Sequence, residues 1–130
     1  MARVLVIEDS ESQRELYRDL LYYNGYDVLT APDAQAGIAT AETELPDLIV
    51  LDVMLPGMSG LVAAEHLTRL PRTAHIPIIC MSAYDVSPAM VEHSGAREFL
   101  AKPLDPSDLM KAVWRQLGAQ GPNTAIPNAE

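Results

Sequence analysis

The sequence predicts an α/β fold in which one parallel β-sheet is covered by helices on both faces. Short apolar runs alternate along the chain with segments of helical periodicity. Several of these runs are nearly unbroken in Val, Ile and Leu, which is typical of strands that are buried on both faces. Alternating strands and helices join parallel strands through right-handed crossovers, and this places helices on both sides of the sheet.

Five apolar runs are the candidate strands. The first, third and fourth are nearly continuous in branched aliphatic residues, whereas the second and fifth are more mixed. Their expected ranges are Val4–Ile7, Asp27–Thr30, Leu48–Leu51, Ile76–Met81 and Glu98–Leu100. Five parallel strands in an open, doubly wound sheet correspond to a flavodoxin-like (βα)5 fold, whose functional sites lie at the carboxyl ends of the strands.

The first two expected helices have clear start and stop signals. Ser10 can cap the first helix, which ends at Asn24-Gly25. Asp33 can cap the second, which is rich in alanine and stops before Pro46, because a proline disfavours the helical conformation of the residue before it.

The other three helices are expected in the second half of the chain. The third runs from about Ser59 to Leu70 and is closed by Pro71. The fourth, from about Ser87 to Ser94, is short and weakly patterned. The fifth begins near Pro106. Its apolar stripe consists of Leu109, Val113 and Leu117.

The composition limits the class of protein. The 130 residues suit one domain, and nine basic against eighteen acidic residues give a net charge of −9. Binding DNA requires a basic surface, so we expect no direct contact with nucleic acid. No segment has the length and apolar character of a membrane span or a signal peptide, so no membrane insertion is expected.

The single cysteine and the end of the chain complete this outline. Cys80 lies within an apolar run and is interpreted as a small buried side chain rather than a reactive thiol. Without a possible internal disulfide, the expected location is cytoplasmic. Residues 1–118 are expected to form the domain. Residues 119–130, which contain prolines and glycines and few apolar residues, are expected to be a C-terminal tail, either flexible or docked on a partner.

Polar side chains follow four of the five predicted strands. Glu8 and Asp9 come after the first strand, Asp52 after the third, Ser82 after the fourth and Lys102 after the fifth. Each residue alone has an ordinary explanation as a helix cap, a turn residue or a surface charge. Because parallel strands end at the same edge of a sheet, we expect three acids, a hydroxyl and an amine to meet in one cleft.

The three acids predict a metal site. Carboxylates that lie close together repel one another unless a cation lies between them. Oxygen ligands suit a hard ion, and Mg²⁺ accepts one or two carboxylates while keeping waters and phosphate oxygens in its shell. A metal held by carboxylates, an aspartate available as a nucleophile and a nearby lysine together indicate phosphoryl transfer.

Four stretches stand at these strand ends: VLVIEDS, LIVLDVMLPGMSG, IPIICMSA and FLAKP. In their order and approximate spacing the chain resembles the receiver domain of two-component response regulators, over about residues 2–118. The resemblance implies that Asp52 is the phosphoacceptor. It also implies that Mg²⁺ is held by Asp52, by Asp9 directly, by Glu8 mainly through water, and by the backbone carbonyl of Met54.

The same resemblance assigns roles to the residues that would surround the phosphoryl group. Ser82, Ala83 and Lys102 would bind its oxygens, and the Lys102-Pro103 peptide bond is expected to be cis. Phe99 stands where the family has an aromatic residue that moves together with the hydroxyl residue. A phenylalanine has no hydroxyl to bury, so Phe99 is expected to discriminate poorly between the two states of the switch.

Two departures from the family pattern carry further expectations. The interval from Ser82 to Lys102 looks slightly short, so the fourth helix is expected to be truncated or displaced. Met54 and Tyr84, the neighbours of the phosphorylation site, have neither an amide nor a carboxylate to position an attacking water. We therefore expect slow self-dephosphorylation.

The implied function is that of a stand-alone signalling switch and not an enzyme. The phosphoryl group would come from a sensor histidine kinase or a histidine phosphotransfer protein in a Mg²⁺-dependent reaction, and its arrival would switch a surface that binds other proteins. A homodimer through the fourth and fifth helices, or through the tail, is left open. The downstream target is not indicated.

Two alternative functions remain at this point. The first is a receiver-like adaptor that acts without phosphorylation. The second is an aspartate-nucleophile phosphatase, which is disfavoured because that chemistry wants an aspartate two residues after the nucleophile, where this chain has Met54.

Overall fold

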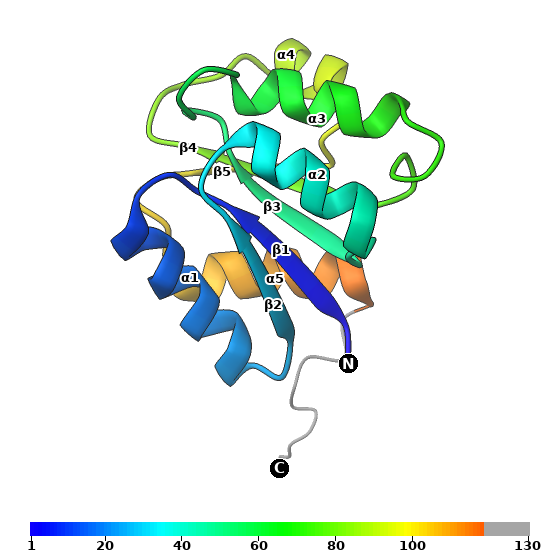
Figure 1. Ribbon diagram of the computed structural model, residues 1–130. Helices are drawn as coiled ribbons and strands as arrows, with labels where there is room; N and C mark the ends of the chain where they lie inside the picture. Colours follow the sequence, from blue (N-terminus) through cyan, green and yellow to red (C-terminus); the bar gives the residue numbers. More distant parts are fainter. Residues whose placement is uncertain (119–130) are drawn as a thin grey trace.

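The computed structural model describes residues 1–118, so the expected tail of residues 119–130 lies outside the described part of the chain. A single sheet carries helices on both faces (Figure 1). Its strands are β1 (Arg3–Ile7), β2 (Asp27–Ala31), β3 (Leu48–Asp52), β4 (Ile78–Ser82) and β5 (Glu98–Ala101). They pair in the order β2-β1-β3-β4-β5, and every pair is parallel. The predicted flavodoxin-like fold is confirmed.

The helices divide between the two faces of the sheet. They are α1 (Glu11–Tyr23), α2 (Ala34–Glu44), α3 (Gly60–Arg69), α4 (Pro88–Ser94) and α5 (Pro106–Leu117). Figure 1 shows α2, α3 and α4 on one side and α1 and α5 on the other. Among residues 1–118 no helix combines the length and the apolar character needed to cross a bilayer.

Two apolar cores, one on each face, explain the unbroken aliphatic runs. Successive side chains of a strand point to opposite faces. On β1, Leu5 and Ile7 join the core under α2 and α3, whereas Val4 and Val6 join the core under α1 and α5. All of β1 after Arg3 is therefore buried, and burial of apolar surface stabilises a fold by about 25 cal/mol per Å².

Side-chain caps begin the helices at the predicted positions. The hydroxyl of Ser10 accepts a hydrogen bond from the Gln13 N–H at 3.4 Å, and the carboxylate of Asp33 accepts one from the Ala36 N–H at 2.8 Å. These contacts satisfy N–H groups that have no partner within the helix. α2 ends at its C-cap residue Leu45, whose backbone lies in the left-handed region with a φ of 48°.

The predicted start of the fourth strand is wrong by two residues. β4 begins at Ile78 rather than Ile76. Pro77 has no N–H to donate to a ladder, and the Ile76 N–H donates instead to the Thr73 carbonyl at 3.0 Å. At its other end β4 includes Ser82, which is in register with Ala101.

The short fourth helix is fastened to its neighbour α3. It contains seven residues. The hydroxyl of Thr68 on α3 donates to the Ser94 carbonyl at 3.1 Å. Gly95 follows with a φ of 85°, and a Cβ at this position would lie 2.6 Å from the Thr68 hydroxyl. Glycine is therefore required both by the backbone conformation and by the close approach of α3.

One ion-pair cluster ties α5 to the edge strand β5. The Glu98 carboxylate accepts hydrogen bonds from Arg115, the shortest at 2.5 Å, and from the Gln116 amide at 2.6 Å. Burial alone would raise the pKa of Glu98, but the hydrogen bonds from Arg115 and Gln116 outweigh burial and lower this pKa from its usual value.

We expect Glu98→Gln to reduce thermal stability in a pH-dependent way. A carboxyl with a depressed folded-state pKa stabilises the fold above its unfolded pKa of 4.5, and this contribution is lost as pH falls through the folded pKa. At pH 7 the variant should lose about 2–4 °C in Tm, and the loss should vanish at lower pH. Circular dichroism melts across pH measure it, with the exposed Glu92→Gln as control. A loss that persists after the carboxyl is protonated would contradict the assignment.

Candidate functional site

The residues predicted to share the carboxyl edge of the sheet all lie there, and the three acids and the Lys102 amine meet. Glu8 and Asp9 follow β1, Asp52 ends β3, Ser82 ends β4 and Lys102 follows β5. One oxygen from each of the three carboxylates lies within 4.8 Å of the others. β1 lies between β2 and β3, so the cluster stands where the strand order reverses, as expected for a doubly wound fold.

Lys102 lies inside this cluster and binds two of the acids. Its Nζ donates to Oε1 of Glu8 at 2.8 Å, to Oδ2 of Asp52 at 2.9 Å and to Oε1 of Gln13 at 2.7 Å. Its side chain is 12% exposed. All three N–H donors of the ammonium are therefore used, and the chain supplies a cation between two buried carboxylates.

The buried acid Glu8 and Lys102 influence each other's protonation. Burial raises the pKa of the Glu8 carboxyl, and the hydrogen bonds from Lys102 and from the Ser10 N–H only partly offset that rise. Burial alone would lower the pKa of Lys102, but its hydrogen bonds to Glu8 and Asp52 outweigh burial and raise this pKa. The ammonium is therefore charged at neutral pH.

Asp52 is fixed through both of its carboxylate oxygens. Oδ1 accepts a hydrogen bond from the Met54 N–H at 2.9 Å, and Oδ2 accepts the one from Lys102. The residue is 4% exposed. Gly60, the first residue of α3, packs against the Asp52 backbone so closely that a Cβ there would lie 2.1 Å from the Asp52 carbonyl oxygen. The start of α3 thus packs directly against the backbone that carries the aspartate.

The two adjacent acids after β1 differ in exposure. Glu8 is 1% exposed, whereas Asp9 is exposed to solvent. Arg14, one turn into α1, donates to the Glu8 carbonyl at 2.8 Å and to the Asp9 carbonyl at 3.4 Å. These contacts hold the loop that presents both acids, and the Asp9 carboxylate is left open to a ligand from solvent.

The fourth strand supplies a hydroxyl to the same rim. Ser82 is 1% exposed, and its Oγ accepts a hydrogen bond from the Tyr84 N–H at 3.1 Å. The Lys102 N–H donates to the Ser82 carbonyl at 2.8 Å, which keeps the two residues side by side. The exposed Ala83 comes next. The Lys102-Pro103 bond is cis, as predicted.

Three further residues have predicted roles. Phe99 is half-buried on β5 and packs against the core under α2 and α3. Met54 is 53% exposed and Tyr84 is 66% exposed. The predicted slow loss of phosphate beside these two residues stays a prediction.

The donor set fits a hard divalent cation. Carboxylates from Glu8, Asp9 and Asp52 provide oxygen ligands within a small volume, and exposed Asp9 leaves an approach from solvent. The Lys102 ammonium lies between Glu8 and Asp52 and already places one positive charge beside these two carboxylates.

Two residues of this site were not predicted from the sequence. Gln13 contacts Lys102, and Arg14 holds the loop before α1. Both lie in the first turns of a helix whose cap, Ser10, directly follows the acids. That adjacency to the rim is the signal that would have indicated them.

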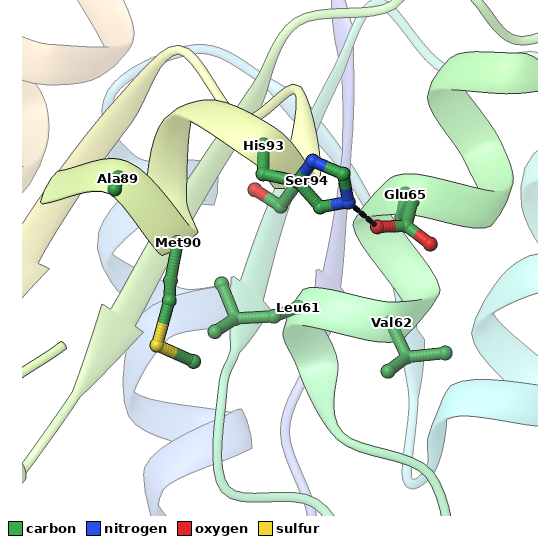
Figure 2. A pocket seen from close by; sticks show the side chains of 7 residues that line it. All are labelled: Leu61, Val62, Glu65, Ala89, Met90, His93 and Ser94. Carbon is green, nitrogen blue, oxygen red and sulfur yellow. Dashed lines mark ion pairs between the residues drawn. The ribbon is translucent and has the colours of Figure 1, made fainter. Parts of the chain in front are cut away.

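A hollow between α3 and α4 differs in character from the acidic rim. Its volume is about 300 Å³. Figure 2 shows Leu61, Val62 and Met90 around it, with the His93 imidazole turned toward Glu65. Nε2 of His93 lies 2.8 Å from Oε2 of Glu65. The hollow is mostly apolar, and Glu65 is the one acid among the residues that line it.

Comparison with known proteins identifies the family. The sequence model of the response regulator receiver domain family matches residues 4–114 of this chain. The chain belongs to this receiver domain family. Receiver domains of two-component systems are in general signalling switches, and the geometry of the acidic rim agrees with a phosphoacceptor role for this one.

Curated relatives with this receiver domain differ in their total length. Protein PilH of Pseudomonas aeruginosa is 34% identical over 115 residues, which are 87% of this chain and 95% of PilH. The response regulator PleD of Caulobacter vibrioides is 41% identical over 106 residues, covering 80% of this chain and 23% of PleD. The phosphate regulon transcriptional regulatory protein PhoB of Escherichia coli is 35% identical over 120 residues, or 88% of this chain and 52% of PhoB.

Solved receiver structures superimpose closely on this one. The chemotaxis protein CheY4 of Vibrio cholerae has a TM-score of 0.83 at 31% identity, over 88% of this chain and 98% of CheY4. A CheY-like receiver domain protein from Methanospirillum hungatei has a TM-score of 0.86 at 26% identity, over 92% of this chain and 96% of its own. The receiver fold thus covers nearly all of residues 1–118.

Proposed function

We propose that this receiver domain is a phosphoacceptor switch in which Asp52 accepts the phosphoryl group. The observation that carries the proposal is the placement of Asp52: a buried carboxylate held by the Met54 N–H and by Lys102, beside two further acids. In the transfer, an Asp52 carboxylate oxygen forms a bond to phosphorus as the bond from phosphorus to the donor's imidazole nitrogen breaks. The electron pair of that broken bond stays on the imidazole.

We further propose that Mg²⁺ is the cofactor. Asp9, Asp52 and the backbone carbonyl of Met54 would hold it directly, and Glu8 mainly through water. The ion would neutralise negative charge on the phosphoryl oxygens during transfer. Lys102 would bind a phosphoryl oxygen from the other side, together with Ser82 and Ala83. Its raised pKa keeps it charged for this role.

The partners follow from the same chemistry. A sensor histidine kinase or a histidine phosphotransfer protein would donate the phosphoryl group, and a protein of unknown identity would receive the signal. Three points stay predictions. They are a homodimer through α4 and α5 or through residues 119–130, a Phe99 that discriminates poorly between the two states of the switch, and slow dephosphorylation beside Met54 and Tyr84. The cytoplasmic location and the absence of direct nucleic-acid binding and of enzymatic turnover also stay predictions.

Labelling by a small phosphodonor tests the proposed function. Wild-type protein is incubated with acetyl phosphate and Mg²⁺, and intact-protein mass spectrometry should detect one added phosphoryl group per chain. Chelation of Mg²⁺ should abolish the addition. If the folded protein is never labelled, the phosphorylation-independent adaptor becomes the better account.

We expect the two acids after β1 to differ in their effect on Mg²⁺ affinity. Asp9→Asn removes an exposed carboxylate that would bind the ion directly, and affinity should fall about tenfold or more. Glu8→Gln should weaken binding less, because Glu8 is already bound to Lys102 and to the Ser10 N–H. Isothermal titration calorimetry measures both affinities. The opposite ranking would remove Asp9 as the direct ligand.

A further inference from the structure

Lys102 has one partner outside the acidic cluster. Its Nζ lies 2.7 Å from Oε1 of Gln13, which is shorter than its distances to Glu8 and Asp52. Gln13 belongs to α1, whereas Lys102 follows β5, so this hydrogen bond joins an early and a late segment of the sequence beside the acidic cluster. Unlike the other two acceptors, the Gln13 amide carries no charge.

Local contacts orient the Gln13 amide toward the ammonium. Its backbone N–H donates to the Ser10 hydroxyl at 3.4 Å, which fixes the residue in the first turn of α1. One turn later, the hydroxyl of the buried Tyr17 donates to the same Oε1 at 3.4 Å. Two donors on one oxygen leave the NH₂ group of the amide directed away from Lys102.

The uncharged acceptor matters because Glu8 and Asp52 are shared between two cations. The two carboxylates bind Lys102 here, and the proposed function requires the same cluster to bind Mg²⁺. A divalent ion draws carboxylate charge to itself and repels the ammonium. An ammonium that loses its acceptors inside a buried site is strongly destabilised. Gln13 lies outside the acidic cluster and can remain bound to Lys102 throughout.

We propose that Gln13 is a positioning residue that holds Lys102 beside Asp52 while Mg²⁺ occupies the acidic cluster. This role rests on the proposed function. The hydrogen bond lets the domain hold a lysine and a divalent cation next to the same aspartate, and it compensates for the weakened contacts of Lys102 with Glu8 and Asp52.

Mg²⁺ binding to the unphosphorylated protein gives the first test. Gln13→Met keeps the length of the side chain and removes its oxygen, and calorimetry should find Mg²⁺ affinity about three- to tenfold weaker. Gln13→Glu restores the acceptor and should bind Mg²⁺ at least as tightly as the wild type. Gln35→Met, at an exposed glutamine of α2, is the matched control and should bind like the wild type.

The rate of labelling by acetyl phosphate at saturating Mg²⁺ gives the second test. It should fall about tenfold in Gln13→Met and recover in Gln13→Glu. If the methionine variant does not fold, Gln13→Ala serves in the same comparison. Equal Mg²⁺ affinity and equal labelling rate in Gln13→Met and Gln35→Met would overturn the role of Gln13. If wild-type protein is not labelled at all, the proposed function fails, and the Mg²⁺ affinities still decide the role of Gln13.

Discussion

Asp52→Asn is expected to abolish labelling by acetyl phosphate, reducing it by at least about a hundredfold. Asparagine keeps the size and the hydrogen bond from the Met54 N–H, but its amide is a poor nucleophile. It also removes one of the two negative charges that Lys102 contacts. The labelling reaction is quenched at a series of times, and intact-protein mass spectrometry measures the labelled fraction in the presence and absence of Mg²⁺.

A matched variant separates loss of the nucleophile from a general disturbance of the site. Asp85→Asn changes an exposed aspartate in the loop after β4, and it should be labelled like the wild type. The Asp52 variant should fold normally, which circular dichroism checks. Labelling of Asp52→Asn at the rate of Asp85→Asn would place the phosphoacceptor elsewhere.

Gly60→Ala should destabilise the fold by about 3 kcal/mol, the top of the usual range for overpacked positions. A Cβ at this position would lie 2.1 Å from the Asp52 carbonyl oxygen and 2.8 Å from the Val53 Cα. Both are backbone atoms, so no side chain can rotate away. The Gly60 N–H also donates to the Val53 carbonyl at 2.8 Å, and separating the two segments would weaken that hydrogen bond.

Gly57→Ala is the informative comparison for this prediction. Gly57 has a φ of 82° and open space around its Cβ position, so alanine there meets only the left-handed backbone penalty of about 1 kcal/mol. Urea unfolding of both variants measures the difference. We also expect slower labelling of Gly60→Ala, because β3 must shift where it carries Asp52. Equal stability losses in the two glycine variants would show that the contact at Gly60 relaxes freely.

Much of this protein is determined by its sequence through the pattern of burial. Strands covered on both faces must be apolar almost throughout, so β1 and β3 can be recognised in the sequence as aliphatic runs. The acids that end these strands stand out because they are charged. Parallel strands end at the same edge of the sheet, and this rule predicted that Asp52 and Lys102 lie close together, as they do. The helix starts at Ser10 and Asp33 were also predictable. Each side chain accepts a hydrogen bond from the backbone N–H three residues later, which has no partner within the helix.

Only the tertiary structure decided which polar groups share partners within the site. Nothing local distinguishes Glu8 from Asp9, yet one is buried against Lys102 and the other is exposed. The Gln13 contact spans 89 positions, and the Gly60 contact depends on how α3 leaves the sheet. Hydrogen bonds and close packing depend on distances of a few tenths of an ångström, which the spacing of residues along a chain does not specify. The sequence therefore determined which strand-end residues lie at the rim, and the tertiary structure determined that Lys102 binds Glu8, Asp52 and Gln13 there.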